Sequence, residues 1–367
     1  MPIPRSPALF VLGAFALAGC GTGAPHQEGG IVVEPERVTE PVTGLAASAF
    51  VATPDGFRWV TNDEGRGLDL RGPDGRPRGT LGGPQWTDVD TRAGVALPEG
   101  EGRVLVTVDE DGQRPRLFTA AGAAGPWEER RLGGLEGTGF APDAACLYHD
   151  EGEGRLYLFL TDGDGGAAQW LIAFEGDEAR AHHMRDLPLG GETAGCAVDD
   201  ARSRLYVAEE GVGVWEANAH PERALQRRPL AMTAPWGRLD EPADIAVHRA
   251  SGTVIVADEG DGRLHLYRAG DGRPLGAIRP GREGEAETVA ATSLAAEGLP
   301  AGAVAVADGG AGRYALLDWR RIAEAVAMEA GEAVAEPRSV PAVAPSEATE
   351  PVASAGDAAD DPAIWVH

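Results

Sequence analysis

A pattern of about fifty residues recurs along the chain and limits the folds open to it. Each copy has a basic or small residue, three or four apolar strand-forming residues, and an acidic turn that contains glycine. The copies begin at Arg58, Arg103, Arg155, Arg204, Thr253 and Ala303, with spacings of 45, 52, 49, 49 and 50 residues. A period of this length fits a four-stranded blade, and six blades close a ring. The sequence predicts an all-β fold, a six-bladed β-propeller of four-stranded antiparallel blades.

The segments around each copy support a meander of short strands. Residues 195–200 precede one copy and residues 213–216 follow it, and Gly, Asp and Pro separate such runs throughout. Helical periodicity is confined to residues 319–328, where one or two helical turns are expected as a plug or exit segment.

The charge of the chain is strongly negative and bears on its partners. There are 58 acidic and 32 basic residues, a net charge of -26, and the hydrophobic fraction of 43% is sufficient for a core. Nucleic acids and anionic membranes would be repelled at long range, so neither is expected as a non-specific partner. Divalent cations are the natural counterions.

The first twenty residues have the pattern of a lipoprotein signal peptide. Arg5 provides the positive region, residues 8–18 the short apolar region, and residues 17–20 resemble a bacterial lipobox, which predicts lipidation at Cys20. The alternative is an ordinary cleaved signal. We expect an exported lipoprotein at the outer membrane, facing the periplasm or the cell surface, with residues 21–40 as a tether and the lipid as its only membrane contact.

Two further cysteines occupy nearly equivalent places in neighbouring repeats. Cys146 and Cys196 lie nine and eight residues before Arg155 and Arg204. An exported protein can oxidise such a pair, but the sequence does not give the Cα separation that a disulfide needs. Buried free thiols are the favoured interpretation.

The end of the chain carries the most specific motif. Residues 329–355 shift to an aperiodic Ala-, Val-, Pro- and Glu-rich composition typical of a linker, and residues 356–367 read Gly-Asp-Ala-Ala-Asp-Asp-Pro-Ala-Ile-Trp-Val-His. This run resembles the opening segment of β-propeller phytases, calcium-dependent phosphatases that hydrolyse inositol hexakisphosphate (phytate). The resemblance implies one propeller at residues 41–328 and the first strand of a second, truncated one at 356–367.

The first propeller also resembles phytase blades. Residues 87–92 resemble a strand of that family, residues 146–170 resemble one of its blades, and residues 195–215 are the most similar stretch. The departures fall where phosphate should be held, because the expected Lys, Arg and Tyr donors and two expected Glu ligands are absent. The residues at these positions are Asp63, Glu110, Gly163, Asp143, Ala194 and Ala246.

The surviving acidic residues are candidate calcium ligands, since Ca²⁺ prefers carboxylate oxygens. By resemblance these are Asp360, Asp361, Glu209, Glu210 and Asp90. The last three are expected where strand ends converge on one face. For most copies the alternative is that Asp, Glu and Gly occur because hairpin turns favour them.

The resemblance implies a 3-phytase, a phosphoric monoester hydrolase acting on phytate or another phosphorylated small molecule in the intact protein. The chain by itself is expected to be inactive, and no catalytic or substrate-binding residue is assigned. The first ring is expected to pack on the second. Two alternatives stay open: a cell-surface propeller that binds a phosphorylated ligand, glycan or protein, and another six-bladed hydrolase such as a calcium-dependent lactonase.

Overall fold

The apolar runs of the repeats form strands that pair with their sequence neighbours. The computed structural model describes residues 30–63, 66–83, 85–136 and 139–331. In each meander the strand nearest the centre comes first. Two sheets are each a single meander of four consecutive strands. The first contains β3 (Ser48–Thr53), β4 (Gly56–Asp63), β5 (Gly67–Arg71) and β6 (Pro77–Leu81), and the second contains β15 (Thr193–Asp199), β16 (Arg204–Glu209), β17 (Gly213–Asn218) and β18 (Arg228–Met232).

A third sheet contains two meanders. Its strands are β7 (Trp86–Leu97), β8 (Gly100–Asp109), β9 (Arg114–Ala121), β10 (Glu128–Gly133), β11 (Ala144–Asp150), β12 (Arg155–Thr161), β13 (Ala167–Glu175) and β14 (Glu178–Asp186). The outer strands β10 and β14 pair in parallel, which joins the meanders into one eight-stranded sheet.

The last two sheets each include a strand from the beginning of the chain. One contains β19 (Pro242–His248), β20 (Thr253–Asp258), β21 (Arg263–Arg268), β22 (Pro274–Pro280) and the parallel strand β1 (Ile31–Val33). The other contains β23 (Ala286–Thr292), β24 (Ala303–Asp308), β25 (Arg313–Asp318) and the antiparallel strand β2 (Arg37–Val38). The prediction that residues 21–40 form a tether is therefore wrong for residues 31–33 and 37–38, because the backbone of these strands pairs with the open edges of two sheets.

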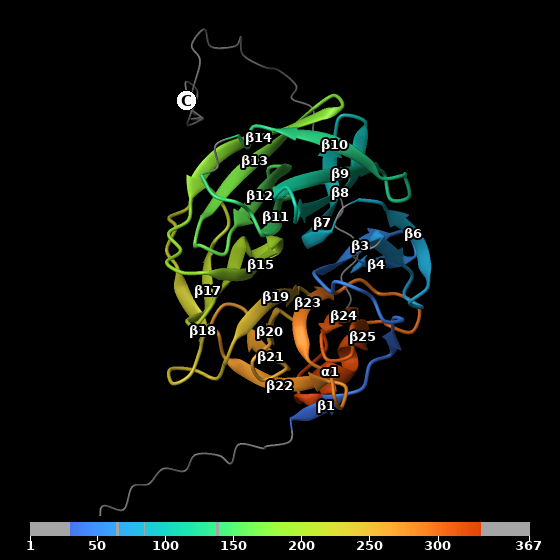
Figure 1. The fold of residues 1–367 in the computed structure, drawn as a ribbon, viewed down its shortest axis with the longest axis vertical. Coiled ribbons are helices and arrows are strands. Elements are labelled where there is room, and N and C mark those ends of the chain that lie inside the picture. Colours follow the sequence, from blue (N-terminus) through green and yellow to red (C-terminus); the bar gives the residue numbers. More distant parts are fainter. Residues whose placement is uncertain (1–29, 64–65, 84, 137–138, 332–367) are drawn as a thin grey trace, which may run out of the picture. The chain divides into compact units, whose positions relative to one another are not determined.

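Within residues 31–331 the sheets surround a centre in a propeller-like ring (Figure 1). The innermost strands β3, β7, β11, β15, β19 and β23 each contact the next, and β23 contacts β3. Apolar clusters fill the spaces between neighbouring sheets, including the space between the last sheet and the first. Tyr314 of β25 is fully buried there, and its hydroxyl accepts a hydrogen bond from the amide of Asn62 at 3.2 Å. These cores hold the ring closed.

The structure overturns the expectation of free thiols. Cys146 of β11 and Cys196 of β15 form a disulfide, with their Cα atoms 6.1 Å apart. The bond forms because neighbouring innermost strands bring two equivalent repeat positions within disulfide distance. It links adjacent sheets across an apolar cluster.

The expected helical segment is confirmed as helix α1 (Trp319–Ala325). The side chain of Asp318 caps its first turn by accepting from the amide of Arg320, and Trp319 and Ile322 pack into the core between the last two sheets. The 3₁₀ turn η1 (Asp200–Arg202) follows β15. No helix in the described part of the chain has the length and apolar character needed to cross a membrane.

Candidate functional site

The acidic turns of the repeats lie beside the segments that lead into the innermost strands. The amide of Glu210 donates to the carbonyl oxygen of Glu192, and that of Glu259 donates to Glu241, both at 2.9 Å. Because strands alternate in direction within a sheet, these turns lie at the end of the ring where the innermost strands begin. We call this end the acidic-turn face and define it by the carboxylates of Glu192, Glu210, Glu241, Glu259, Glu285 and Glu287.

These carboxylates influence one another electrostatically. None of them forms an ion pair with a basic residue that the structure describes. Burial raises the pKa of Glu210, and the charges of Glu192, Glu241 and Glu259 raise it further. Burial and neighbouring carboxylates likewise raise the pKa of Glu287. A bound cation would relieve this repulsion, and carboxylate oxygens are suitable ligands for Ca²⁺.

Glu209 and Glu210 are adjacent in sequence but differ in their surroundings. Glu210 is exposed on the acidic-turn face. Glu209 is only 3% exposed, and its carboxylate accepts from the indole N–H of Trp215, from Arg227 at 3.2 Å and from the amide of Gly190 at 3.1 Å. Its oxygens are therefore engaged by protein donors, whereas those of Glu210 are open to a cation.

Asp90 does not lie at a strand end, which corrects the placement expected from the sequence. It is the fifth residue of β7 and lines the central channel. Its carboxylate accepts from its neighbour Thr91 at 2.7 Å, from the amide of Leu147 on β11 at 2.8 Å, and from Arg92 at 2.8 Å. Asp90 joins two innermost strands.

Two other aspartates of the innermost strands, which the sequence did not single out, make the same kind of bridge. Asp88 of β7 accepts from the amides of Val89 and of Ala145 on β11, at 2.8 and 2.7 Å. Asp244 of β19 accepts from its neighbour Ile245 at 2.7 Å and from an amide of β23 at 2.8 Å. The only sequence signal was that both precede a β-branched residue early in an innermost strand.

Burial raises the pKa of Asp88 to about 7 and that of Asp244 to about 8, with a contribution from the charge of Asp88 to the second value. A carboxyl group with a raised pKa keeps its proton in the folded chain after the unfolded chain has lost it. The free energy of unfolding should therefore fall as the pH rises from about 4 to about 8.

We expect urea unfolding of the full chain to show this fall between about pH 5 and about pH 8. The variant D88N/D244N cannot titrate at these positions, so its stability should change less over the same interval, whatever its absolute value. Equal slopes for the two proteins would contradict the assignment.

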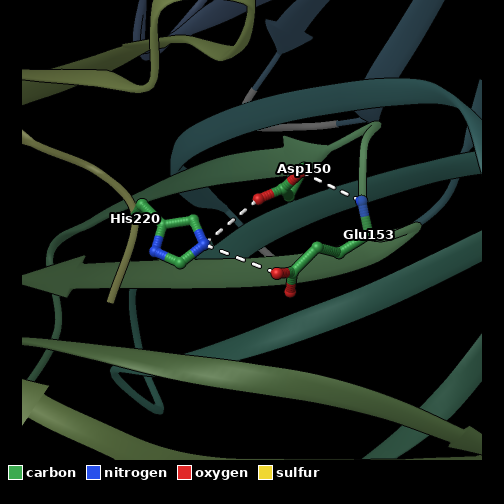
Figure 2. Close-up of side chains that lie close together, drawn as sticks. All are labelled: Asp150, Glu153 and His220. Carbon is green, nitrogen blue, oxygen red and sulfur yellow. Dashed lines mark hydrogen bonds and ion pairs between the residues drawn. The ribbon is translucent and has the colours of Figure 1, made fainter. Parts of the chain in front are cut away.

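A second cluster, at the opposite end of the ring, contains His220, Asp150 and Glu153 (Figure 2). The Nε2 atom of His220 lies 3.6 Å from Asp150 and 3.8 Å from Glu153. Its Nδ1 atom accepts from the amide of Glu222 at 3.2 Å. An accepting Nδ1 places the ring proton on Nε2, which then has no lone pair for a metal. This arrangement favours polar contacts between protein groups over metal ligation.

A third cluster stabilises one acidic turn. The carboxylate of Asp258 accepts from the amide of Glu241 at 2.9 Å, and Nε2 of His265 lies 2.9 Å from a carboxylate oxygen of Asp261. The ring of His265 and the backbone therefore occupy these carboxylates. The cluster holds the turn that carries Glu259 against the start of β19.

The positions where the phytase resemblance expects phosphate donors also lie at the acidic-turn end. Asp63 ends β4, Glu110 follows β8, Asp143 precedes β11 and Gly163 follows β12. Anions are repelled by this end unless cations are bound. The predicted ligands Asp360 and Asp361 and the predicted lipidation site Cys20 lie outside the described residues.

Known proteins resemble both the sequence and the fold. A family model described as Phytase matches residues 140–298 and 317–367, more than half of the chain. The 3-phytase of Bacillus subtilis (strain 168) is 33% identical over 76 residues, which is 20% of this chain and 20% of that relative. The chain thus spans about a fifth of the length of the curated relative that it matches.

A solved structure from Bacteroides thetaiotaomicron VPI-5482, described as a structural genomics protein of unknown function, has a similar fold. The match covers 78% of this chain and 75% of the other, with a TM-score of 0.51 and 10% identity. At this identity the likeness concerns the fold alone. The extent of the family-model match shows that the chain belongs to the phytase family.

Proposed function

We propose that this chain is the N-terminal, calcium-binding part of a phytase that hydrolyses phosphate monoesters of phytate. The observation that supports this most strongly is the acidic-turn face of a member of the phytase family, because its carboxylates pair with no basic residue in the described part of the chain. Hydrolysis would require the intact protein, with a second propeller beginning at residues 356–367 and packing on the first. The matched part of the B. subtilis 3-phytase is short, so the activity rests on family membership.

We also propose that the ring is a six-bladed propeller, in which the eight-stranded sheet provides two blades. One apolar cluster lies between each pair of neighbouring meanders, which is the packing expected between the blades of a propeller. From sequence pattern, residues 1–20 are proposed as a lipoprotein signal peptide with lipidation at Cys20, which would anchor the protein at the outer membrane.

The residues of the acidic-turn face fit calcium. Glu210, Glu241 and Glu259 are exposed and surround one stretch of this face, and Ca²⁺ takes several oxygen ligands in flexible geometry. When bound, the ion would supply positive charge to which phosphate oxygens bind. The carboxylates would hold the ion in a fixed position, because the turns that carry Glu210 and Glu259 are hydrogen-bonded to the segments that lead into the innermost strands.

One observation favours a second candidate, a binding module without activity. Asp63, Glu110 and Asp143 are acidic where the resemblance expects donors to phosphate. The ring would then be a non-catalytic propeller at the cell surface that binds a phosphorylated ligand, a glycan or a protein.

Calorimetric titration of phytate into the full chain tests both candidates. With millimolar Ca²⁺ we expect binding, and with excess EDTA we expect none, because the face repels anions when no cation is present. The chain by itself should release no phosphate above background. Binding that is unchanged by EDTA would rule out a calcium bridge.

The variant E210Q/E241Q/E259Q should weaken calcium-dependent binding at least about tenfold, as expected for the loss of several charged ligands. Its matched control is E101Q/E128Q/E175Q, which removes three exposed carboxylates elsewhere on the sheets. Equal loss in both variants would mean that net charge, and not this face, determines binding.

A further inference from the structure

The central channel contains a cavity at the end opposite the acidic-turn face. Its volume is about 200 Å³, and it is lined by the innermost strands. His149, Asp200 and Arg249 lie at the ends of β11, β15 and β19, whereas Glu192 and Glu241 lie just before β15 and β19 begin. The cavity is therefore separate from the proposed calcium face.

His149 is the least expected residue of this cavity. It lines the wall and is only 5% exposed, yet its imidazole has no hydrogen-bond partner among the described residues. Its backbone amide alone is engaged, donating to Asp200 at 3.3 Å. Burial lowers the pKa of His149, so the neutral ring offers one N–H donor. The ring nitrogens remain accessible from the cavity, so a ligand or a water molecule can reach them.

Arg249 offers further donors in the same wall. Its Nη2 atom lies 2.7 Å from Asp200, while Nε and Nη1 have no partner in the described part of the chain. Asp200 and Asp90 also pair with the buried Arg92, each at 2.8 Å. The two arginines balance these two aspartates, which leaves the remaining N–H groups of Arg249 free for another acceptor.

Two hydroxyl groups complete the donor set. Ser293 Oγ accepts from the amide of Ala250 at 2.9 Å, and Thr292 Oγ accepts from the amide of Leu294 at 3.2 Å. Each hydroxyl keeps its own proton to donate, and both residues line the cavity.

We propose that this cavity is a binding site for a small oxyanion, a carboxylate or a phosphate, held by Arg249 and His149 with help from Ser293 and Thr292. The unused groups are predominantly donors, and an arginine fork suits two oxygens of one anion. The exposed carboxylate of Glu151 at the rim opposes binding. The site therefore holds a single small anion and excludes larger polyanions.

Titrating inorganic phosphate and acetate separately into the full chain, in excess EDTA, tests this proposal. EDTA removes any anion binding that is bridged by calcium. A negative result in this titration would therefore contradict the cavity site alone and would leave the proposed calcium-dependent function untouched. We expect at least one anion to bind, R249Q and H149L each to weaken binding at least about tenfold, and E151Q to tighten it. Tighter binding of phosphate than of acetate would indicate that the site takes a phosphate group, and the reverse order would indicate a carboxylate.

The matched control is R202Q. Arg202 lies at the same end of the ring and pairs with Asp199 at 2.8 Å, but it does not line the cavity. H149L replaces an unpartnered polar group by an apolar one, so it should fold even if R249Q does not. Failure of both anions to bind, or equal weakening in R202Q and R249Q, would overturn the proposal.

Discussion

Replacing Cys146 and Cys196 by alanine is expected to lower the free energy of unfolding by about 4 kcal/mol. The disulfide closes a loop with a sequence separation of 50, and without it the unfolded chain gains the corresponding entropy. Both cysteines are buried in the apolar cluster between β11 and β15, so alanine adds no unpartnered polar group. Urea unfolding of the full chain without reductant measures the difference.

Reduction provides the matched control for this variant. Dithiothreitol should lower the stability of the wild-type chain by a similar amount and leave C146A/C196A unchanged. If the wild type and the double variant unfold at the same urea concentration without reductant, the bond contributes no net stability, and the loop-entropy argument fails.

The ring could be predicted from the sequence because most of its strands pair with strands that are adjacent in sequence. Each repeat, such as the one beginning at Arg204, contains its own strand formers and turn, and its strands pair with their neighbours in sequence. Strands β1 and β2 could not be predicted in this way. Residues 31–33 and 37–38 are short, lie among Pro and Glu residues, and pair with partners more than 240 residues further along the chain.

The disulfide depended on the same long-range geometry. The sequence placed Cys146 and Cys196 at nearly equivalent positions of two repeats, but their separation follows from how two innermost strands pack side by side. The strand register within one sheet therefore does not determine the separation of the two cysteines. That separation depends on the distance between neighbouring sheets, which the apolar cluster between them determines.

The candidate site was predicted only in part. The acidic turns were visible as a repeated pattern, and Glu210 lies on the face they form. Which carboxylates are open to a cation depends on donors distant in sequence. Arg227 is 18 residues from Glu209 and engages it, and the amide of Leu147 is 57 residues from Asp90. The sequence gives no signal for the role of His149, because that role depends on its imidazole having no hydrogen-bond partner among the described residues.

The buried guanidinium of Arg92 is expected to contribute strongly to the stability of the ring. In R92M we expect the free energy of unfolding to fall by about 3–5 kcal/mol. The buried carboxylate of Asp200 loses one cation, and Asp90 loses the only cation with which it pairs among the described residues. Arg92 also donates to the carbonyl oxygens of Leu147 and Val198, which would lose this donor. Its contacts therefore connect β7 with β11 and β15.

The comparison that isolates this network is R78M, measured by urea unfolding under the same conditions. Arg78 pairs with Asp74 at the same 2.8 Å, but both of these side chains are exposed, at 48% and 40%, against 8% and 2% for Arg92 and Asp200. An exposed pair contributes less than about 1 kcal/mol, because water and salt screen it. The double variant R92M/D200N should lose less than the sum of its single variants, since each removes the other's partner. A loss in R92M as small as that in R78M would show that the ring is held by its apolar cores, with the buried ion pairs contributing no net stability.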